Sequence, residues 1–435
     1  MSLLNALRLF CAQFDETITY WIAYSGGLDS EVLLSLCHQL QSEINIKVRA
    51  IHIHHGLSPN AKNWASHCRK MCERYAMDYV EHSIQLDLQR GDSLEAIARE
   101  KRYGIFKEVL AEGDVLFTAH HEDDQAETVL LQLLRGAGTK GLAAMPAIKS
   151  LGKGYHGRPL LSFPRSDLQQ YAKEQNLTWV EDESNQNTSL ARNFIRLDIL
   201  SKLKLRFPSV TATLARSAAH CAENQMLLEA FARELPMHGS RENTLSVEKL
   251  LQCSPEKQRL ILRFWIHALN YPLPNSKKMD SIQRDVLLAS RDCSPLVEWG
   301  AVRLRRHKDD LHLVPVSREP VLSTLSWEVH HALILPHLGE LKTTPVQGAG
   351  LRADISAVSV RFRQGGEVLD MRTRGRHTLK NLFQEWDILP WERDTMPLIF
   401  VEETLIAIAG LFLHEDFTAK GNEMGREILF ARQKN

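Results

Sequence analysis

Residues 22–36 read IAYSGGLDSEVLLSL, and this stretch decides the fold. An apolar run is followed by two glycines, and helix-forming residues resume after Asp29. Gly26 and Gly27 allow the positive φ or the close backbone approach that a sharp strand-to-helix turn requires. The start of the helix presents unpaired N–H groups and the positive end of its dipole, so the stretch predicts an anion-binding site. The simpler alternative is a tight turn in which Asp29 or Ser30 only caps the helix.

Strands and helices alternate through the first half of the chain. The predicted strands are 19–25, 46–55, 78–86 and 114–121, and the predicted helices are 31–41, 63–75, 93–112, 123–136 and 166–176. This alternation predicts an α/β domain with a parallel sheet and right-handed crossovers. In such open sheets ligands bind beyond the carboxyl ends of the strands. The polar loops that follow the first, second and fourth strands are therefore the candidate site.

The pattern changes after Pro208. Amphipathic helices are predicted to about residue 295, and short strands follow from about residue 297. The last hundred residues mix predicted strands with a helix at 378–386. We therefore expect three domains: a parallel-sheet domain at 1–210, a mainly helical domain at 211–320 and a small mixed α+β domain at 321–435.

Composition bounds the class of protein. The chain has 435 residues, 44% of them hydrophobic, and 53 basic residues balance 53 acidic ones, so net charge says nothing about partners. Seven irregularly spaced cysteines without a C-x-x-C pair argue against a disulfide framework and predict buried, reduced thiols. The amphipathic start is unlike a signal peptide, and no apolar run approaches the roughly 18 residues of a membrane span. We expect a cytoplasmic protein without a membrane partner.

The SGGLDS loop excludes two common phosphate motifs. It lacks the lysine of G-x-x-x-x-G-K-[ST], and it is not G-x-G-x-x-G. An aspartate beside phosphate is repulsive unless Asp29 helps to hold Mg²⁺. In the first strand-to-helix turn the loop closely resembles the PP-loop of the ATP pyrophosphatases. That resemblance implies cleavage of the α–β bond of ATP and retention of pyrophosphate. The ATP-binding residues it implies are Ala23, Ser25, Gly26, Gly27, Leu28, Asp29, Ser30, His55 and Gly56.

Two further loops carry histidines and acids. His52 and His54 share one face of a strand while His55 points away, which makes a tetrahedral metal site awkward and favours a role in lining the nucleotide pocket. Asp123 alone would satisfy helix capping in the loop after the fourth strand. Asp124 and Glu127 exceed that need, and such a cluster suits Mg²⁺ or a cationic amine.

SGGLDS, HHGL and HHEDDQAET together resemble the PP-loop enzymes that modify tRNA bases. The thiolases among them use cysteines, and none of these loops contains one. The segment WVEDESNQNTSLARNFIR matches the E-D-x-S-N…R-N-x-x-R pattern of the tRNA(Ile)-lysidine synthases. The C-terminal RTRGRHTLKNLFQEWDILPWERD is similar to their long proteobacterial form, so the resemblance covers essentially the whole chain. A PP-loop enzyme that uses ammonia or sulfur, or an inactive RNA-binding relative, remains the alternative.

The resemblance implies a two-step ligation. ATP would adenylate the C2 oxygen of the wobble cytidine in the CAU anticodon of tRNA(Ile), and the ε-amine of free L-lysine would then displace AMP. The product, lysidine, would change the codon read from AUG to AUA. The expected partners are ATP, Mg²⁺, lysine and this tRNA, and no obligate protein partner is evident.

The chemistry of these two steps predicts roles for side chains, and the resemblance adds Arg102, which matches the family's Arg-Tyr position. Asp29 is the expected magnesium ligand and Arg102 the expected catalytic cation, with Arg99, one helical turn away, as its rival. Asp124 and Glu127 are candidates for binding lysine, and Asp124 ranks first as the carboxylate that takes its proton. Which acids hold Mg²⁺ and which bind lysine stays open.

Two basic segments predict tRNA contacts. Residues 192–206 carry five cations and one acid, and residues 361–380 carry six cations and two acids, so each has a net charge of +4. Such patches bind phosphates with an affinity that falls with salt. The expected tRNA-binding residues are Arg192, Asn193, Arg196, Arg372, Arg374, Arg376 and Lys380. Trp386 and Trp391 are possible stacking residues, although a core position is the favoured interpretation for Trp386.

Overall fold

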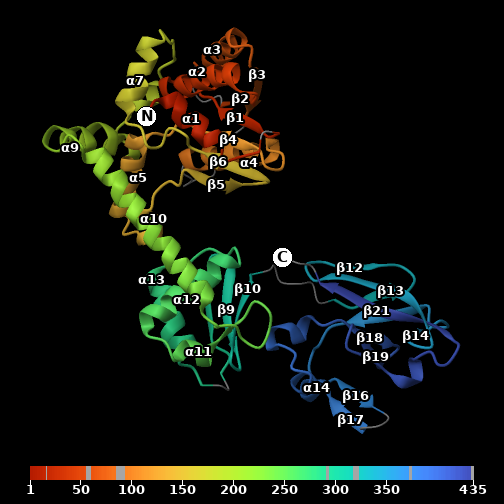
Figure 1. Cartoon of the computed structure of the whole chain (residues 1–435). Helices are drawn as coiled ribbons and strands as arrows, with labels where there is room; N and C mark the ends of the chain where they lie inside the picture. Colours follow the sequence, from red (N-terminus) through yellow and green to blue (C-terminus); the bar gives the residue numbers. More distant parts are fainter. Residues whose placement is uncertain are drawn as a thin grey trace. The chain divides into compact units, whose positions relative to one another are not determined.

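The computed structural model describes residues 1–15, 17–54, 60–84, 94–290, 293–316, 323–371 and 375–432, without the side chains of 94–96 and 184. The chain divides into two compact units, Met1–Ala230 and Phe231–Asn435, and each is described by itself (Figure 1). The division falls within the helix α10 (Val210–Glu234). The expected three-domain boundaries stay a prediction.

A six-stranded sheet forms the centre of the first unit. Its strands are β1 (Thr19–Ala23), β2 (Lys47–His54), β3 (Asp78–Ser83), β4 (Val115–Phe117), β5 (Ile148–Leu151) and β6 (Gly154–Gly157), in the order β3-β2-β1-β4-β6-β5. All neighbours are parallel except β5 and β6. The expected parallel α/β sheet is confirmed, and the β5–β6 hairpin is an addition that the sequence pattern did not predict.

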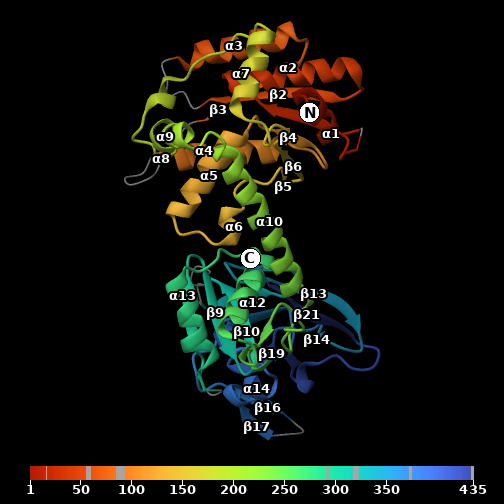
Figure 2. The same ribbon diagram turned by 60° about the vertical axis from the view of Figure 1, so that its left-hand side comes forward.

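Helices cover both faces of this sheet, as Figures 1 and 2 show. The large core on one face takes its buried residues from α1 (Leu3–Cys11), α2 (Leu28–Glu43), α3 (Ala61–Arg74) and α7 (Arg165–Glu174). On the other face Phe106 of α4 (Leu94–Val109) and Leu110, which follows the helix, pack against Trp21, Ile51 and Leu116 of the strands. Because both faces are buried, β1 reads as an almost continuous apolar run.

The rest of the first unit is helical. It comprises α5 (Glu122–Leu134), α6 (Thr139–Leu142), a 3₁₀ turn at Glu183–Gln186, α8 (Ala191–Phe194), a π-helical segment at Ile195–Leu200, α9 (Ser201–Arg206) and α10. The predicted end of α5 at Gly136 is confirmed, because Gly136 has φ +68° just after the cap residue Arg135. A small core joins α5, the π-helical segment and the start of α10.

The second unit begins with a helical part beside an antiparallel sheet. Its helices are α11 (Val247–Leu251), α12 (Pro255–Ala268) and α13 (Ser276–Ser281), with a π-helical segment at Ile282–Leu287. The sheet has the order β7-β10-β9-β8, with β7 (Leu245–Ser246), β8 (Leu296–Trp299), β9 (Val302–His307) and β10 (Asp310–Pro315). Helices and sheet share one core. The expected change from helices to strands near residue 297 is confirmed.

The C-terminal part consists of short antiparallel strands. One sheet, β11-β15-β18-β19-β20, contains β11 (Leu325–Glu328), β15 (Ala357–Arg361), β18 (Leu398–Val401), β19 (Thr404–Ile408) and β20 (Phe412–Leu413). Another, β12-β13-β21-β14, contains β12 (Leu333–Leu335), β13 (Gly339–Gln347), β14 (Leu351–Arg352) and β21 (Met424–Arg432). A hairpin of β16 (Val368–Met371) and β17 (Gly375–Thr378) precedes α14 (Leu379–Glu385), and 3₁₀ turns lie at Pro390–Thr395 and Glu415–Phe417. The expected mixed α+β character is confirmed.

Asp387 ties the two parts of the second unit together. Its carboxylate accepts hydrogen bonds from Arg241 and Lys308 at 2.6 Å each, and it lies 3.4 Å from Nε2 of His307. His307 ends β9, Lys308 lies in the turn before β10 and Arg241 precedes β7, whereas Asp387 follows Trp386, the cap residue of α14. The two parts therefore share polar contacts within one compact unit.

The cysteines and the helices test two further expectations. All seven cysteines are free thiols; Cys11, Cys37, Cys68 and Cys72 are buried. Cys293 is exposed and Cys221 and Cys253 are half-buried, so the expectation of buried thiols is wrong for these three residues. In the described ranges, no helix combines the length and apolar character that crossing a membrane would require.

Candidate active site

The SGGLDS loop connects the end of β1 to the start of α2. Gly26 has φ +81°, and a Cβ built there would lie 2.9 Å from Sγ of Cys68 and 3.1 Å from Cγ2 of Val180. Both the conformation and the packing therefore require glycine at this position. Gly27 differs, because its φ is −78° and its nearest neighbour would be 3.7 Å away. Among the described residues, a Cβ at Gly27 would meet only ordinary van der Waals contacts, and the Gly27 N–H makes a long 3.5 Å hydrogen bond to the Ser25 hydroxyl that a bound anion could replace.

The first turn of α2 has no side-chain cap. Gly27 is the N-cap residue and makes no capping bond. The Ser30 hydroxyl donates to the Gly27 carbonyl at 2.9 Å and lies 3.1 Å from the Ser25 hydroxyl. The alternative in which Asp29 or Ser30 merely caps the helix is therefore wrong. The helix N-terminus keeps the unpaired N–H groups that an anion would use.

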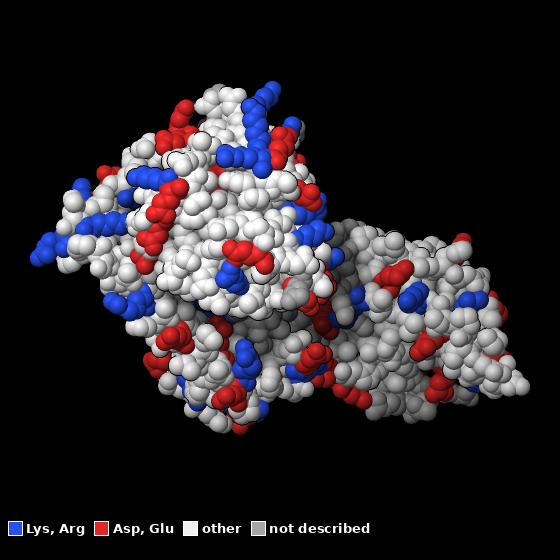
Figure 3. Space-filling model, turned by 45° about the horizontal axis from the view of Figure 1, so that its top comes forward, with Lys and Arg blue, Asp and Glu red and all other residues white. Residues whose placement is uncertain are grey.

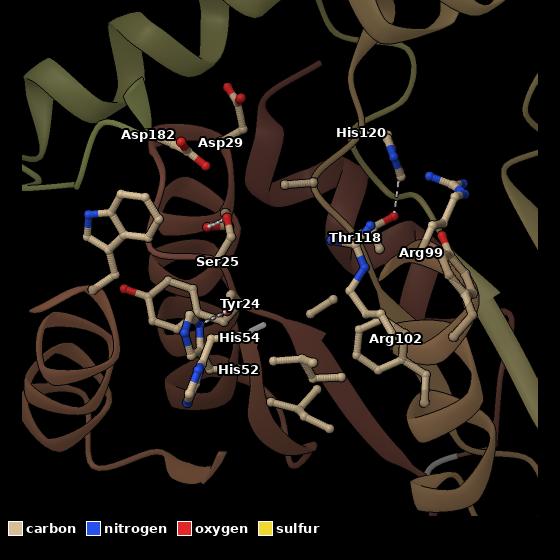
Figure 4. A pocket seen from close by; sticks show the side chains of 18 of the residues that line it. Tyr24, Ser25, Asp29, His52, His54, Arg99, Arg102, Thr118, His120 and Asp182 are labelled. Atoms are coloured by element: carbon tan, nitrogen blue, oxygen red, sulfur yellow. Dashed lines mark hydrogen bonds between the residues drawn. The ribbon is translucent and has the colours of Figure 1, made fainter. Parts of the chain in front are cut away.

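A cavity of about 310 Å³ lies beside this loop (Figure 4). It opens at the carboxyl ends of β1, β2 and β4, the position expected for a ligand in an open α/β sheet. Of the residues predicted to bind ATP, Ala23, Ser25, Asp29 and Ser30 line it, while His55 and Gly56 lie outside the described residues. The other lining residues are Tyr24, Ile51, His52, Ile53, His54, Ala61, Trp64, Arg99, Arg102, Tyr103, Phe106, Thr118, Ala119, His120 and Asp182.

Two arginines face the phosphate loop across the cavity. Arg99 and Arg102 both come from α4, and Figure 4 shows them on the side opposite Ser25 and Asp29. The guanidinium of Arg99 lies over the ring of Tyr103, 5.0 Å from its centroid. Both cations reach the same cavity, so its geometry does not separate the predicted catalytic cation from its rival.

The carboxylate of Asp29 is only loosely engaged. Nε2 of His121 lies 3.7 Å from Oδ2, Nε of Arg165 lies 3.5 Å from Oδ1, and the side chain is 31% exposed. Burial alone would lower the pKa of His121, but the nearby carboxylates of Asp29 and Asp124 raise it. With Nδ1 of His121 accepting a backbone N–H, its proton lies on Nε2, which faces Oδ2 of Asp124 at 3.3 Å and Oδ2 of Asp29 at 3.7 Å.

His121, not Asp123, caps the helix that carries the acid cluster. Its ring accepts the Asp124 N–H, and the Asp124 carboxylate accepts the His121 N–H at 3.1 Å. Asp123 instead accepts the backbone N–H of Arg165 at 2.9 Å and pairs with Lys204. The interpretation of Asp123 as the cap is therefore wrong, and its carboxylate fastens α5 to α7 and α9.

Asp124 and Glu127 are held by the two arginines of the LARNFIR segment. Arg192 lies 2.9 Å from Asp124 and 2.7 Å from Glu127, and Arg196 lies 3.1 Å and 2.5 Å from the same carboxylates. The acids are three residues apart on α5 and the arginines four residues apart across a π-helical segment, a feature often found at functional sites. Burial would raise the pKa of Asp124, but the charges of His121 and Arg192 lower it.

This arrangement joins residues that the sequence placed in different roles. Arg192 and Arg196 are predicted tRNA contacts, and Asp124 and Glu127 are predicted lysine ligands, yet the four side chains form one ion-pair cluster. The Glu127 side chain is fully buried, and the arginines are 28–29% exposed. Asn193 is buried, and its amide donates to the carbonyl of Asn187 at 3.0 Å.

The C-terminal basic segment is partly described. Arg376 is 80% exposed and lies 3.8 Å from Asp370, and Lys380 is exposed on α14. Arg372 and Arg374 fall outside the described residues. Figure 3 shows basic and acidic side chains interspersed over the face in view, in keeping with the balanced composition.

The two tryptophans are engaged within the second unit. Trp386 packs against the core around α14 and stacks on Phe412, with ring centroids 6.3 Å apart, which confirms the core interpretation. Trp391 contacts the rings of His307 and His312 and lies under the guanidinium of Arg305.

Several polar residues of the site were not singled out from the sequence. Thr118 and His120 line the cavity, and behind them lie His156 of β6 and Arg158. The sequence TAHH, residues 118–121, indicated a loop at the end of the fourth strand, but it did not predict a role for Thr118 or His120. His156 and Arg158 lie on or after the hairpin that was not predicted.

Comparisons with known proteins agree along the chain. The model of the PP-loop domain matches residues 5–203, that of the TilS substrate binding domain matches 245–312, and that of the TilS substrate C-terminal domain matches 358–429. The chain is 44% identical to the tRNA(Ile)-lysidine synthase of Coxiella burnetii, over 97% of this chain and 95% of that protein. It is 42% identical to the synthase of Methylococcus capsulatus, over 93% of this chain and 94% of that protein. It is 40% identical to the synthase of Serratia proteamaculans, over 91% of each protein.

Proposed function

The chain belongs to the tRNA(Ile)-lysidine synthases, and on that premise we propose how its residues carry out the reaction. It is an ATP-dependent ligase that forms lysidine on tRNA(Ile), as its similarity to curated synthases and its PP-loop domain show. We propose that the reaction has two steps in the cytoplasm, with an adenylated cytidine between them, and that it changes decoding from AUG to AUA. The uncapped helix at the rim of the cavity is the observation that carries this proposal.

In the first step the cytidine O2 attacks the α-phosphorus of ATP, and the α–β bond breaks. The free N–H groups at the start of α2, with the hydroxyls of Ser25 and Ser30, hold the departing pyrophosphate. Arg102 or Arg99, across the cavity, neutralises the charge that develops at the α-phosphate. ATP then lies between two sources of positive potential that the fold holds in place.

Asp29 fits a magnesium ligand in this arrangement. Its nearest cationic groups are 3.5 Å and 3.7 Å away, so the oxygens are not saturated by short hydrogen bonds. In the described part of the chain no three His, Cys, Asp or Glu side chains converge on a metal site. Mg²⁺ typically takes one or two carboxylates and completes its shell with substrate phosphates and water. Bound Mg²⁺ would neutralise charge on the pyrophosphate.

In the second step the lysine ε-amine attacks C2 of the adenylated base, the C2–O bond breaks and AMP leaves. Asp124 and Glu127 are proposed to bind the ammonium form of lysine, and Asp124 is proposed to take the proton that the ammonium loses before the free amine attacks. The lowered pKa of Asp124 suits this electrostatic role but makes it a weak base. Arg192 and Arg196 occupy these carboxylates, so lysine binding requires at least one of them to move. We propose that tRNA phosphates draw the arginines away, which would make lysine binding dependent on tRNA.

The direct test is incubation with ATP, Mg²⁺, labelled lysine and CAU-anticodon tRNA(Ile). We expect label in the tRNA and one AMP and one pyrophosphate per lysidine. Folded protein that transfers no label would contradict the proposal. Calorimetry with lysine, with and without tRNA and a non-hydrolysable ATP analogue, tests the exchange of arginines. Equal lysine affinity in both cases would overturn that exchange.

The variant Asp29→Ala distinguishes the adenylation step from tRNA binding. Because the variant lacks the proposed magnesium ligand, we expect it to lose pyrophosphate release while binding tRNA with unchanged affinity. Gel-shift titration measures the second property. Normal pyrophosphate release by the variant would contradict a role for Asp29 in the first step.

Arg102→Ala and Arg99→Ala form a matched pair on one face of α4. Removing a cation that stabilises transition-state charge lowers kcat about 10²- to 10³-fold. We expect the larger loss in Arg102→Ala, and single-turnover pyrophosphate release is the measurement. The opposite order would assign the role to Arg99.

The C-terminal basic segment is proposed to bind tRNA through phosphates, within the proposed tRNA-binding domains 211–320 and 321–435. Arg376→Ala/Lys380→Ala should weaken binding and reduce the slope of log K against log salt by about 1–2. Lysine affinity should not change. Lys47→Ala/Lys173→Ala removes two exposed cations of the first unit and is the control. Identical salt slopes in the two variants would reject the assignment.

A further inference from the structure

Four polar side chains form a line from the interior to the cavity. NH2 of Arg158 lies 3.1 Å from Nδ1 of His156, and Nε2 of His156 lies 2.8 Å from the hydroxyl of Thr118. That hydroxyl lies 2.7 Å from Nδ1 of His120. Arg158 and His156 are buried, whereas Thr118 and His120 line the cavity. The line therefore connects a buried cation to the surface of the proposed nucleotide site.

The chemistry of the four groups fixes the direction of every hydrogen bond. A guanidinium only donates, so Nδ1 of His156 must be an acceptor and its proton must sit on Nε2. That Nε2–H then donates to the Thr118 oxygen. The hydroxyl has one proton of its own, which is left to donate to Nδ1 of His120. An accepting Nδ1 in a neutral ring leaves the proton of His120 on Nε2.

Two further observations agree with neutral rings. Burial, together with the charge of Arg158, lowers the pKa of His156 to about 3. Burial and the nearby arginines also lower the pKa of His120 to about 3, although the charge of Asp124 opposes them. Among the residues that the structure describes, Nε2 of His120 has no hydrogen-bond partner. The N–H is thus available on the residue that lines the cavity.

We propose that Arg158, His156 and Thr118 are positioning residues that hold His120 as its Nε2–H tautomer, so that it donates a hydrogen bond to an oxygen of the bound reactant. This inference rests on the proposed function, because it requires the nucleotide to bind in this cavity. The acceptor is a phosphoryl oxygen of ATP or the O2 carbonyl of the target base. A neutral donor of this kind does not take the lysine proton, so His120 is excluded as that base.

Thr118→Val and Thr118→Ser are the matched variants. Valine keeps the shape but removes the hydroxyl, and serine restores it. Long-range ¹H–¹⁵N spectra of protein labelled at the histidine rings report the tautomer, with His120→Gln to assign the signal. We expect the Nε2–H tautomer in the wild type and in Thr118→Ser, and a mixture in Thr118→Val. A wild-type His120 that carries its proton on Nδ1, or two protons at neutral pH, would overturn the proposal.

Kinetics supply the second readout. We expect Thr118→Val to lower kcat about tenfold, with the KM for lysine unchanged and with Thr118→Ser close to the wild type. Equal rates in the two variants would contradict the positioning role. Arg158→Met removes the donor that sets the polarity and should also give mixed tautomers at His120. If it does not fold, the Thr118 pair still decides the question.

Adding each ligand separately identifies the group that accepts the hydrogen bond from His120. A shift of the His120 Nε2 signal with a non-hydrolysable ATP analogue alone points to phosphate, and a shift only after adding CAU tRNA(Ile) points to the base. No shift with either, in protein shown to bind both, would overturn the hydrogen bond. The tautomer is measured without turnover, so its failure is distinguishable from failure of the proposed two-step reaction.

Discussion

At the scale of single residues, the two glycines of the phosphate loop play different parts. Gly26→Ala places a side chain at φ +81° against Cys68, and we expect it to lose about 1–3 kcal/mol of stability and most ATP-dependent activity. Gly27→Ala fits the backbone, so its melting temperature should be unchanged while the KM for ATP rises. Thermal melts measure the stability of the two variants, and pyrophosphate release measures their ATP-dependent activity. If Gly27→Ala left the KM unchanged, phosphate would not approach this N–H.

The glycine turn at Gly26 could be predicted from the sequence, and Asp29 proposed as a ligand, because both arguments depend on neighbouring residues alone. A glycine pair between a strand and a helix limits the backbone, and the missing lysine excludes other phosphate motifs. The tautomer of His120 was not predictable, since it depends on His156 and Arg158, more than 30 residues away along the chain. The engagement of Arg192 with Asp124 is similarly non-local.

At the scale of elements, regular apolar periodicity was sufficient to predict the long strands and helices, whereas short strands could not be predicted from it. The main strands and helices of the first unit follow their apolar patterns. The β5–β6 hairpin was missed because its strands have four residues each and LGKGYHG is rich in glycine, which strands disfavour. Tertiary packing explains those glycines: a Cβ at Gly154 would lie 2.2 Å from the Asp114 carbonyl oxygen, and one at Gly157 about 3 Å from Phe10 and Phe117.

The contact between α5 and the π-helical segment gives a prediction at this scale. Arg196→Ala leaves the buried carboxylate of Glu127 with one cation instead of two, which should destabilise the first unit by about 3 kcal/mol. Arg8→Ala is the control, because it breaks an exposed pair with Glu43 that contributes about 0–1 kcal/mol. Urea unfolding followed by circular dichroism compares the two variants. Equal midpoints would mean that Arg192 alone compensates Glu127.

At the scale of the whole molecule, the second unit contains a carboxylate that links its stability to acid. Hydrogen bonds from Lys308 and Arg241 hold the pKa of Asp387 far below its usual range. A carboxyl whose pKa is lowered in the folded state stabilises the fold at pH values above its unfolded-state pKa of about 4. This stabilisation is lost as the pH falls from about 4 towards the folded-state pKa. Calorimetry should therefore show the second unit losing stability below about pH 4, and losing less in Asp387→Asn. Parallel pH profiles for the variant and the wild type would exclude this linkage.

The packing of Cys68 beneath Gly26 has a consequence for chemical reactivity. Burial raises the pKa of the Cys68 thiol, and the neighbouring Cys72 and Glu31 raise it further. Nucleophilic attack and oxidation proceed through the thiolate, so this sulfur is chemically inert while the unit is folded. Alkylating reagents will consume the exposed Cys293 first. The loop proposed to hold pyrophosphate is thus supported by a cysteine that oxidants reach only after the fold has opened.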